Sequence, residues 1–365
     1  MARRGKARTV LLTGFPGFLG RRLLEALARE GVGDRFVLLV QERMVEAAEA
    51  SLASLGESIE GFAGRWELVV GDISQRRLGL EPEAYDALAD RVTRVWHLAA
   101  LYNLAVEEQL AYRVNVVGTV NVLDFCERAR EFERLNYVST SYVSGSRQGL
   151  IREVELDEGQ GFKNHYESTK FWAEVEVQRR LDRLPAVIFR PGIVVGDSRT
   201  GETDKYDGPY TLMRFIMKMP DGAPMLNIGD GESLVNIVPV DYAIAAMVAI
   251  AGQEGAVGQV FHIADPNPMR ARDLVSLILE TMGKAPPMGR VPPLLVDALM
   301  RLKPLRELVD VPREAIVYFN HNARYDTANT QDALEDTPLR CPHISTYLDV
   351  LINYLERNPD RPRPV

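Results

Sequence analysis

The stretch that decides the fold is Thr13-Gly14-Phe15-Pro16-Gly17-Phe18-Leu19-Gly20, which follows an apolar run at residues 9–13. Its three glycines would let the chain turn sharply, let the backbone approach a diphosphate, and let the next helix pack closely on the strand. An apolar stripe in residues 23–28 predicts that helix, and Gly31 and Gly33 end it. Free N–H groups and the helix dipole favour an anion at such a helix start. The stretch therefore predicts nucleotide binding, with a plain tight turn as the alternative.

Short apolar runs rich in β-branched residues recur along the first half of the chain. Each run is apolar on both faces, and a segment long enough for a helix separates it from the next. The runs are residues 9–13, 36–40, 66–70, 95–98, 135–139 and 187–190. Such runs are typical of buried parallel strands joined by helical crossovers, and one clear crossover helix is expected over residues 112–128. The sequence thus predicts an α/β fold with a doubly wound parallel sheet.

The element pattern changes after the sixth run. Residues 196–234 are rich in Gly, Asp, Pro and Tyr, and residues 266–365 form proline-rich helical pieces. Between them, residues 236–263 predict a strand, a helix and a strand that return to the sheet. We therefore expect two domains: residues 8–195 plus 235–265 for the dinucleotide, and residues 196–234 plus 266–365 for the substrate.

Composition excludes several classes of protein. The 365 residues are 46% apolar and 26% charged, and 43 basic against 51 acidic side chains argue against a nucleic-acid partner. Cys126 and Cys341 alone cannot form a disulfide framework or a four-ligand zinc site, which favours a reduced, cytoplasmic setting. The histidines show no metal-ligand spacing, so no metal site is expected. The longest apolar run, residues 243–251, is shorter than the ~18 residues of an integral membrane segment.

The charges after the second strand bear on which dinucleotide would bind. An acid there would hold a ribose 2′-hydroxyl and favour NAD, whereas a base would accept the 2′-phosphate of NADP. Both signs are present, because Glu42 stands beside Arg43 and Arg21 is within reach, while Gln41 at the strand tip is neutral. These charges favour NADP(H) over NAD(H) and leave NAD(H) open. Asp72, after the third strand, either contacts the adenine amine or caps a turn.

Tyr166 and Lys170 form a Tyr-x-x-x-Lys pair at the start of a helix expected over residues 166–182. The spacing of four puts both side chains on one helix face. A nearby ammonium lowers the pKa of a phenol, which would make Tyr166 a usable proton donor or acceptor near neutrality. The cluster Ser139-Thr140-Ser141 ends the fifth strand. A hydroxyl there either binds a substrate carbonyl or simply caps the strand end.

An ordered set of motifs resembles the extended short-chain dehydrogenase/reductases over residues 9–265. The motifs are TGFPGFLG at 13–20, GDI at 71–73, HLAA at 97–100, NVVGT at 115–119, YVSTSYVSG at 137–145, YESTK at 166–170 and RPGIVVGDS at 190–198. The resemblance implies a Rossmann fold and an NAD(P)-dependent oxidoreductase.

The resemblance also implies roles for individual residues. Tyr166 would transfer a proton, Lys170 would tune it and hold the cofactor ribose, and Asn115 would support a proton-relay water. Thr140 would orient the carbonyl, with Ser139 as the alternate. The further cofactor-binding residues would be Thr13 to Gly20, Arg21, Gln41, Arg43, Asp72, Ile73, Ala99, Ala100, Pro191, Gly192, Ile193 and Val194.

Three segments are similar to one subgroup, the fatty acyl-CoA reductases, male-sterility proteins and thioester reductase domains. They are GDISQRRLGL at 71–80, FHIADPNPMRARDL at 261–274 and YDTANT at 325–330. The subgroup implies NADPH-dependent reduction of a lipid-like acyl thioester to an aldehyde, with acyl-CoA, an acyl-carrier thioester, an aldehyde or a ketone as substrate. The second strand ends in Val-Gln here, where Val-Arg is frequent in the subgroup. A homodimer through two long helices is usual among relatives.

Two other functions stay open. A nucleotide-sugar or steroid-type epimerase, dehydratase or dehydrogenase would retain NAD and bind a diphosphate through residues 196–234, which contain Arg199, Lys205, Arg214 and Lys218. A non-catalytic dinucleotide-sensing module is the second alternative, which the intact Tyr166 and Lys170 argue against.

Overall fold

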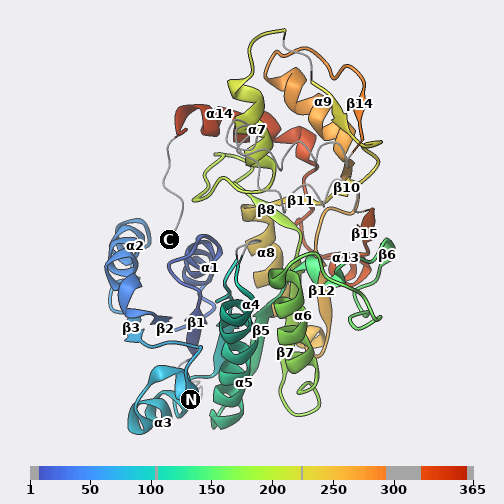
Figure 1. Cartoon of the computed structure of the whole chain (residues 1–365). Coiled ribbons are helices and arrows are strands. Elements are labelled where there is room, and N and C mark those ends of the chain that lie inside the picture. Colours follow the sequence, from blue (N-terminus) through green and yellow to red (C-terminus); the bar gives the residue numbers. More distant parts are fainter. Residues whose placement is uncertain (1–7, 103–105, 223–224, 293–321, 360–365) are drawn as a thin grey trace.

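A seven-stranded parallel sheet forms the centre of the molecule (Figure 1). The computed structural model describes residues 8–102, 106–222, 225–292 and 322–359. The strand order is β12-β7-β5-β4-β1-β2-β3. The strands are β1 (Thr9–Thr13), β2 (Arg35–Val40), β3 (Trp66–Val70), β4 (Arg94–His97), β5 (Arg134–Val138), β7 (Ala186–Pro191) and β12 (Val260–Ile263). The order reverses between β1 and β4, which opens a crevice at the carboxyl ends of the strands and confirms the doubly wound fold.

Helices cover both faces of the sheet, because each helix buries one apolar stripe against it. One face carries α1 (Phe18–Arg29), α2 (Val45–Ser58) and α8 (Val240–Ala251). The other face carries α3 (Pro82–Ala89), α5 (Gly118–Arg128) and α6 (His165–Gln178). The helix expected from residue 112 begins earlier, as α4 (Glu108–Ala111), and runs through a π-helical segment, Tyr112–Val117, before α5.

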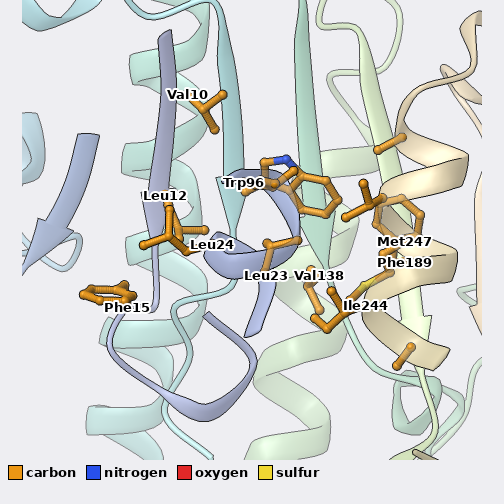
Figure 2. Close-up of a cluster of buried hydrophobic side chains, with 14 of the residues drawn as sticks. Val10, Leu12, Phe15, Leu23, Leu24, Trp96, Val138, Phe189, Ile244 and Met247 are labelled. Atoms are coloured by element: carbon orange, nitrogen blue, oxygen red, sulfur yellow. The ribbon is translucent and has the colours of Figure 1, made fainter. Parts of the chain in front are cut away.

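The packing of α1 fixes the position of the glycine-rich stretch that precedes it (Figure 2). Leu23 and Leu24 are fully buried against Leu12 of β1 and the neighbouring strands. On the same face, the rings of Trp96 and Phe189 stack with centroids 5.8 Å apart. Each such side chain contributes roughly 1.5–3 kcal/mol by its burial. The start of α1 is therefore held firmly at the carboxyl ends of the strands.

A second lobe lies beyond the carboxyl ends of the strands, at the top of Figure 1. Its core is formed by α7 (Pro209–Lys218), α9 (Ala271–Thr281) and α14 (Leu348–Arg357). Met213 is a fully buried member of this core. Two-stranded sheets complete the lobe: β9 (Asn227–Ile228) with β14 (Arg290–Val291), and β10 (Leu234–Val235) with β13 (Met269–Arg270).

Two expectations about strands were wrong in detail. The strand expected near residue 236 is β11 (Ile237–Pro239), which pairs with β8 (Ile193–Val195) and not with the main sheet. The reason is that β8 follows β7 directly and extends away from the sheet, so it offers the nearer edge. The third run, β3, is not buried on both faces; it lies at the sheet edge, and Val70 is 46% exposed.

Part of the C-terminal segment packs beside the dinucleotide-binding part and not within the second lobe. Strand β15 (Ala323–Tyr325) pairs with β6 (Gly149–Ile151), and α13 (Ala328–Ala333) packs against β12. The two-domain division stays a proposal. Strand β15 and helix α13 fall within the expected substrate lobe by sequence but contact β6 and β12 of the expected dinucleotide-binding domain. Residues 293–321 of the expected substrate lobe lie outside the described part. Short 3-10 turns complete the elements: η1 (Glu42–Met44), η2 (Arg76–Gly79), η4 (Ser141–Ser144), η5 (Glu254–Ala256) and η7 (Ile344–Thr346). No helix in the described residues is long and apolar enough to cross a membrane.

Candidate active site

The glycine-rich turn between β1 and α1 has no room for a Cβ at Gly14 or Gly20. Gly14 has a φ of +91°, and a Cβ added there would lie 2.9 Å from the backbone nitrogen of Ala99. A Cβ at Gly20 would lie 2.5 Å from the carbonyl oxygen of Gly14. The turn is closed by a hydrogen bond from the Gly17 amide to the Gly14 carbonyl, at 3.0 Å. Bare backbone at a helix start is a cradle that fits the diphosphate of a dinucleotide.

A buried hydrogen-bond chain holds this turn against β4. Burial lowers the pKa of His97 to about 3, so the ring is neutral. Thr119 donates to the carbonyl oxygen of Asn115 at 2.6 Å, so its hydroxyl accepts from Nε2–H of His97 at 3.0 Å. Nδ1 of His97 then accepts from Thr13 at 2.8 Å, and Thr13 accepts from the amide of Ala99 at 3.2 Å. These hydrogen bonds position both Thr13 and Ala99, two of the residues expected to contact the cofactor.

A pocket of about 480 Å³ lies at the end of β2 and β3. Its lining residues are Gln41, Glu42, Arg43, Val70, Gly71, Asp72, Gln75 and Gly79. Gln41 donates to Asp72 at 3.1 Å and accepts from Nε of Arg43 at 3.0 Å. Gln41, Arg43 and Asp72, which the sequence predicts as cofactor-binding residues, thus line one pocket.

Asp72 and Ile73, in the loop after β3, also make contacts within the protein. Asp72 also accepts from the amide of Ser74 at 2.8 Å, so its turn-capping role is present as well. The side chain of Ile73 is buried against Gly118, where an added Cβ would lie 2.8 Å from Ile73 Cδ1. The side chain of Ile73 therefore anchors the loop to α5. Any contact of Ile73 with a ligand would be made by its backbone.

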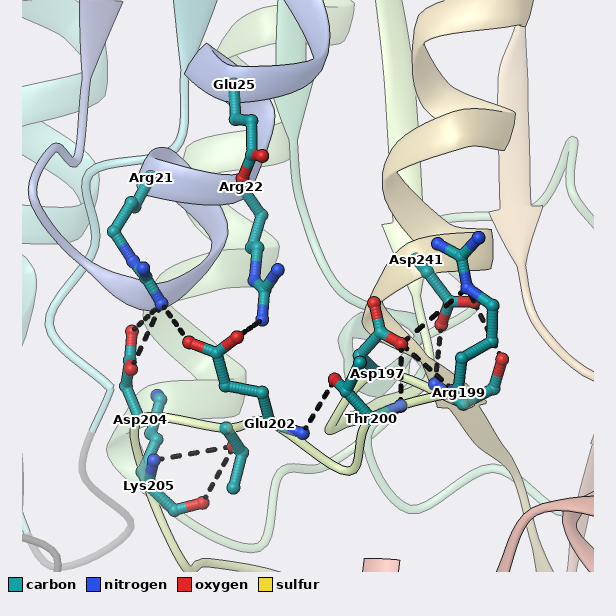
Figure 3. A network of polar contacts seen from close by, with 12 residues as sticks. Arg21, Arg22, Glu25, Asp197, Arg199, Thr200, Glu202, Asp204, Lys205 and Asp241 are labelled. Carbon is teal, nitrogen blue, oxygen red and sulfur yellow. Dashed lines mark hydrogen bonds and ion pairs between the residues drawn. The ribbon is translucent and has the colours of Figure 1, made fainter. Parts of the chain in front are cut away.

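Arg21 is paired with the second lobe and is not among the lining residues of that pocket. Its guanidinium donates to Glu202 at 3.2 Å and to Asp204 at 3.3 Å (Figure 3). Arg22, one residue on, pairs with Glu202 at 2.8 Å. These ion pairs connect the start of α1 to residues 201–207, which we call the strap. The strap carries Lys205, whose Nζ lies 4.6 Å from the ring centroid of Tyr102.

Tyr166 and Thr140 meet at the carboxyl end of the sheet. Asn164 caps α6 by accepting from the amide of Glu167 at 3.0 Å, which places Tyr166 in the first helical turn. The pKa of the Tyr166 phenol is raised by burial, contrary to the expectation that Lys170 lowers it, and a hydrogen bond with the Thr140 side chain acts in the opposite direction. The Tyr166 ring packs edge-on against Tyr102 with centroids 4.9 Å apart. The phenol is therefore protonated and held between a hydroxyl and an aromatic wall.

Lys170 lies one turn further along α6 and is almost completely buried. Its Nζ donates to the Tyr137 hydroxyl at 3.0 Å and to the carbonyl of Val138 at 2.9 Å. Burial lowers the pKa of Lys170 to about 7, and the carboxylate of Glu174 partly offsets this effect. A change of charge at Lys170 is thus accessible near neutral pH.

The other two candidate side chains are engaged by the protein. Ser139 donates to the carboxylate of Glu174 at 2.5 Å, which favours Thr140 as the hydroxyl that faces a substrate. Asn115, in the π-helical segment, accepts from the amide of Leu101 at 2.8 Å and donates to Thr169 at 3.0 Å. Asn115 therefore links α6 to the loop that carries Tyr102.

The residues at the end of β7 and directly after it, also expected to contact the cofactor, are fixed by backbone hydrogen bonds. The amide of Gly192 donates to the carbonyl of Ile263 at 3.0 Å, and the amide of Ile193 donates to the backbone carbonyl of Asn236 at 2.9 Å. Pro191 is buried, whereas Gly192, Ile193 and Val194 stay partly accessible, as do Ala99 and Ala100 after β4.

Residues 12–247 match the family model described as male sterility protein. The chain belongs to the male sterility protein family. A fatty acyl-CoA reductase of Drosophila melanogaster, wat, is 27% identical over 67% of this chain and 54% of its own length. The terminal R domain from the myxalamid PKS-NRPS biosynthetic pathway superposes with a TM-score of 0.81 and 27% identity, over 99% of this chain and 94% of that chain.

More distant structures share the fold alone. A UDP-glucuronic acid 4-epimerase from Bacillus cereus in complex with NAD has a TM-score of 0.67 and 20% identity, over 97% of this chain and 98% of that chain. The chain spans between 5% and 36% of the length of four curated relatives that it matches.

In this member of the male sterility family, several contacts of the candidate site could not be predicted from the sequence motifs. Tyr102 and Tyr137 carry no local signal, because each reaches Tyr166 or Lys170 only through the fold. Glu174 could have been found, since it continues the spacing of four that runs from Tyr166 to Lys170. The strap carboxylates that bind Arg21 lie more than 180 residues away in sequence.

Proposed function

We propose that this chain reduces a lipid-like acyl thioester, or a related aldehyde or ketone, with NADPH as the hydride donor. The observation that carries the proposal is the contact of Tyr166 with Thr140, with Lys170 one helical turn away, at the sheet edge that also holds the glycine cradle. A protonated phenol beside a hydroxyl is suited to a carbonyl oxygen. The names of the Drosophila reductase and of the R domain support the acyl thioester as substrate class.

The residues divide the chemistry as follows. The nicotinamide, when bound, would supply a hydride to the carbonyl carbon. Thr140 and Tyr166 would bind the carbonyl oxygen, and Tyr166 would donate its proton as charge develops there. The ammonium of Lys170 would stabilise the phenolate left on Tyr166. With a thioester, the protonated adduct then loses its thiol, so the products are one aldehyde and one free thiol.

The preference for NADPH rests on the pocket at the end of β2. Arg43 is exposed, lines the pocket and is hydrogen-bonded to Gln41, the neutral residue at the strand tip. A guanidinium binds phosphate by paired, charge-assisted hydrogen bonds. Glu42, beside it, is the feature that would favour NADH.

Acyl-CoA and acyl-carrier thioesters are both proposed as donors, because they share the pantetheine thioester. An epimerase or a dehydratase is supported by the fold alone. A homodimer and a cytoplasmic setting stay predictions from the sequence.

The test is titration of the purified protein with NADPH and with NADH, followed by addition of a long-chain acyl-CoA. Tighter binding of NADPH and acyl-dependent loss of its absorbance support the proposal. Protein that purifies with NAD bound and ignores acyl-CoA would indicate the epimerase class.

A further inference from the structure

A fully buried carboxylate lies behind the residues proposed to bind the carbonyl. Glu174 is on α6, one turn beyond Lys170 and two turns beyond Tyr166, so the three side chains share a helix face. The mechanism above gives Glu174 no role. A carboxylate with no exposed surface is retained only where its charge and lone pairs are well satisfied.

Glu174 joins α6 to the ends of two strands. Oε2 accepts from the hydroxyl of Ser139, at the end of β5, at 2.5 Å. Oε1 accepts from Nη2 of Arg190, on β7, at 2.6 Å and from Nε at 2.9 Å. One side chain therefore ties the helix of Tyr166 and Lys170 to the residue directly before Thr140.

The other side of Arg190 is closed by neutral groups. Its Nη1 donates to the carbonyl of Glu153 at 3.2 Å and lies 3.4 Å from Nε2 of His262. Burial lowers the pKa of His262 to about 3, so the ring is neutral. Nδ1–H of His262 donates to the carbonyl of Asp326 at 2.7 Å, which leaves Nε2 free to accept from Arg190. The ion pair of Glu174 and Arg190 is thus held on all sides.

We propose that Glu174 is a positioning residue for the reduction, which sets the Thr140 hydroxyl against the Tyr166 phenol and supports the charge of Lys170. This inference rests on the proposed function. A link between Ser139 and α6 controls the separation of Thr140 and Tyr166, because Thr140 is the next residue along the chain. Small displacements of such groups cost a large part of the rate.

The charge effect adds to the geometric one. The groups that face Lys170 are the Tyr137 hydroxyl, the carbonyl of Val138, the neutral His97 and Glu174. Of these, Glu174 supplies the negative charge that favours the ammonium. Its removal lowers the pKa of Lys170 further, and the ammonium is then lost at a lower pH.

The test compares Glu174→Gln with the double variant Glu174→Met/Arg190→Met. The double variant replaces the buried pair by apolar side chains, a change that proteins tolerate when volume is kept. We expect kcat to fall about 10- to 100-fold in both, with KM unchanged and the alkaline limb of the pH profile moved to lower pH. Ser139→Ala, which cuts one link and keeps the ion pair, should give a smaller loss of kcat. Glu176→Gln, on the same helix and paired with Arg179 at 2.6 Å, is the matched control.

The outcomes separate this inference from the proposed function. A folded double variant with wild-type kcat and pH profile would overturn the positioning role, as would a loss that only tracks the unfolded fraction. If the wild-type protein binds NADPH but reduces no carbonyl, the proposed function fails. NMR titration of the Lys170 side chain then decides: a lower pKa in Glu174→Gln than in Glu176→Gln supports the coupling, and equal values contradict it.

Discussion

Replacing Gly20 by Ala should damage the turn that precedes α1, although alanine is the better helix former. Helix propensity alone predicts a gain of about 1 kcal/mol. The structure predicts a loss, because the new Cβ would lie 2.5 Å from the Gly14 carbonyl oxygen, where ordinary contact begins at 3.4 Å. The turn must move by most of an ångström, and overpacking of this kind costs about 1–3 kcal/mol.

The same displacement should weaken nucleotide binding. Loss of one backbone hydrogen bond to a charged phosphate costs about 1.5–3 kcal/mol, which corresponds to about a 10- to 100-fold increase in Kd for NADPH. Binding is measured by fluorescence titration, and the free energy of unfolding by urea denaturation.

Gly56→Ala is the matched control for this substitution. Gly56 lies in α2, is exposed, and has no atom within 4 Å of its added Cβ. It should stabilise the protein by up to about 1 kcal/mol and leave Kd unchanged. The reasoning is refuted if Gly20→Ala behaves like Gly56→Ala in both measurements.

Further predictions concern the cofactor pocket, Lys170 and the strap. Arg43→Gln should raise the Kd of NADPH about 10-fold or more and leave that of NADH unchanged, because only NADPH carries the 2′-phosphate; equal effects on the two nucleotides in the titration would contradict this. Because the pKa of Lys170 is lowered to about 7, kcat should fall as pH rises through about 7 and the ammonium is lost. The same shift in the pKa of Lys170 should make the free energy of unfolding decrease as pH falls from 10.5 toward 7, because the unfolded chain takes up the proton first. Lys170→Met should remove this dependence on pH. An unchanged dependence in urea titrations would show that Lys170 is not its source. Glu202→Gln weakens the pairs with Arg21 and Arg22 that hold the strap, and Lys205 of the strap contacts Tyr102, which packs against Tyr166. It should therefore raise the KM of the acyl substrate and lower the free energy of unfolding by no more than about 1 kcal/mol. A KM equal to that of the wild type in steady-state assays would contradict this.

The sequence predicts the sheet well, because its signals are local. Each of the six runs lies within a residue or two of a strand, and the helix and second strand expected within residues 236–263 are α8 and β12. The edge position of β3 could not be predicted in this way, since burial of a strand depends on which strands flank it. The same applies to β11, whose residues fit either sheet and whose partner is set by the path of β8.

The candidate site shows the same division. Tyr166 and Lys170 follow from spacing, and the glycine turn follows from its place between a strand and a helix. The choice between Ser139 and Thr140 does not, because it depends on Glu174, 35 residues away from Ser139. The pairing of Arg21 with Glu202 and Asp204 joins two lobes, and charge near the turn gave no indication of it.

Tyr166→Phe tests most directly whether Tyr166 donates the proton in a reduction driven by NADPH. The measurement is single-turnover oxidation of NADPH by acyl-CoA, with NADPH affinity determined on the same preparation. Loss of the hydroxyl should lower the rate by about 10²–10⁴-fold while the Kd of NADPH stays at the wild-type value. A variant that oxidises NADPH at the wild-type rate would contradict the account.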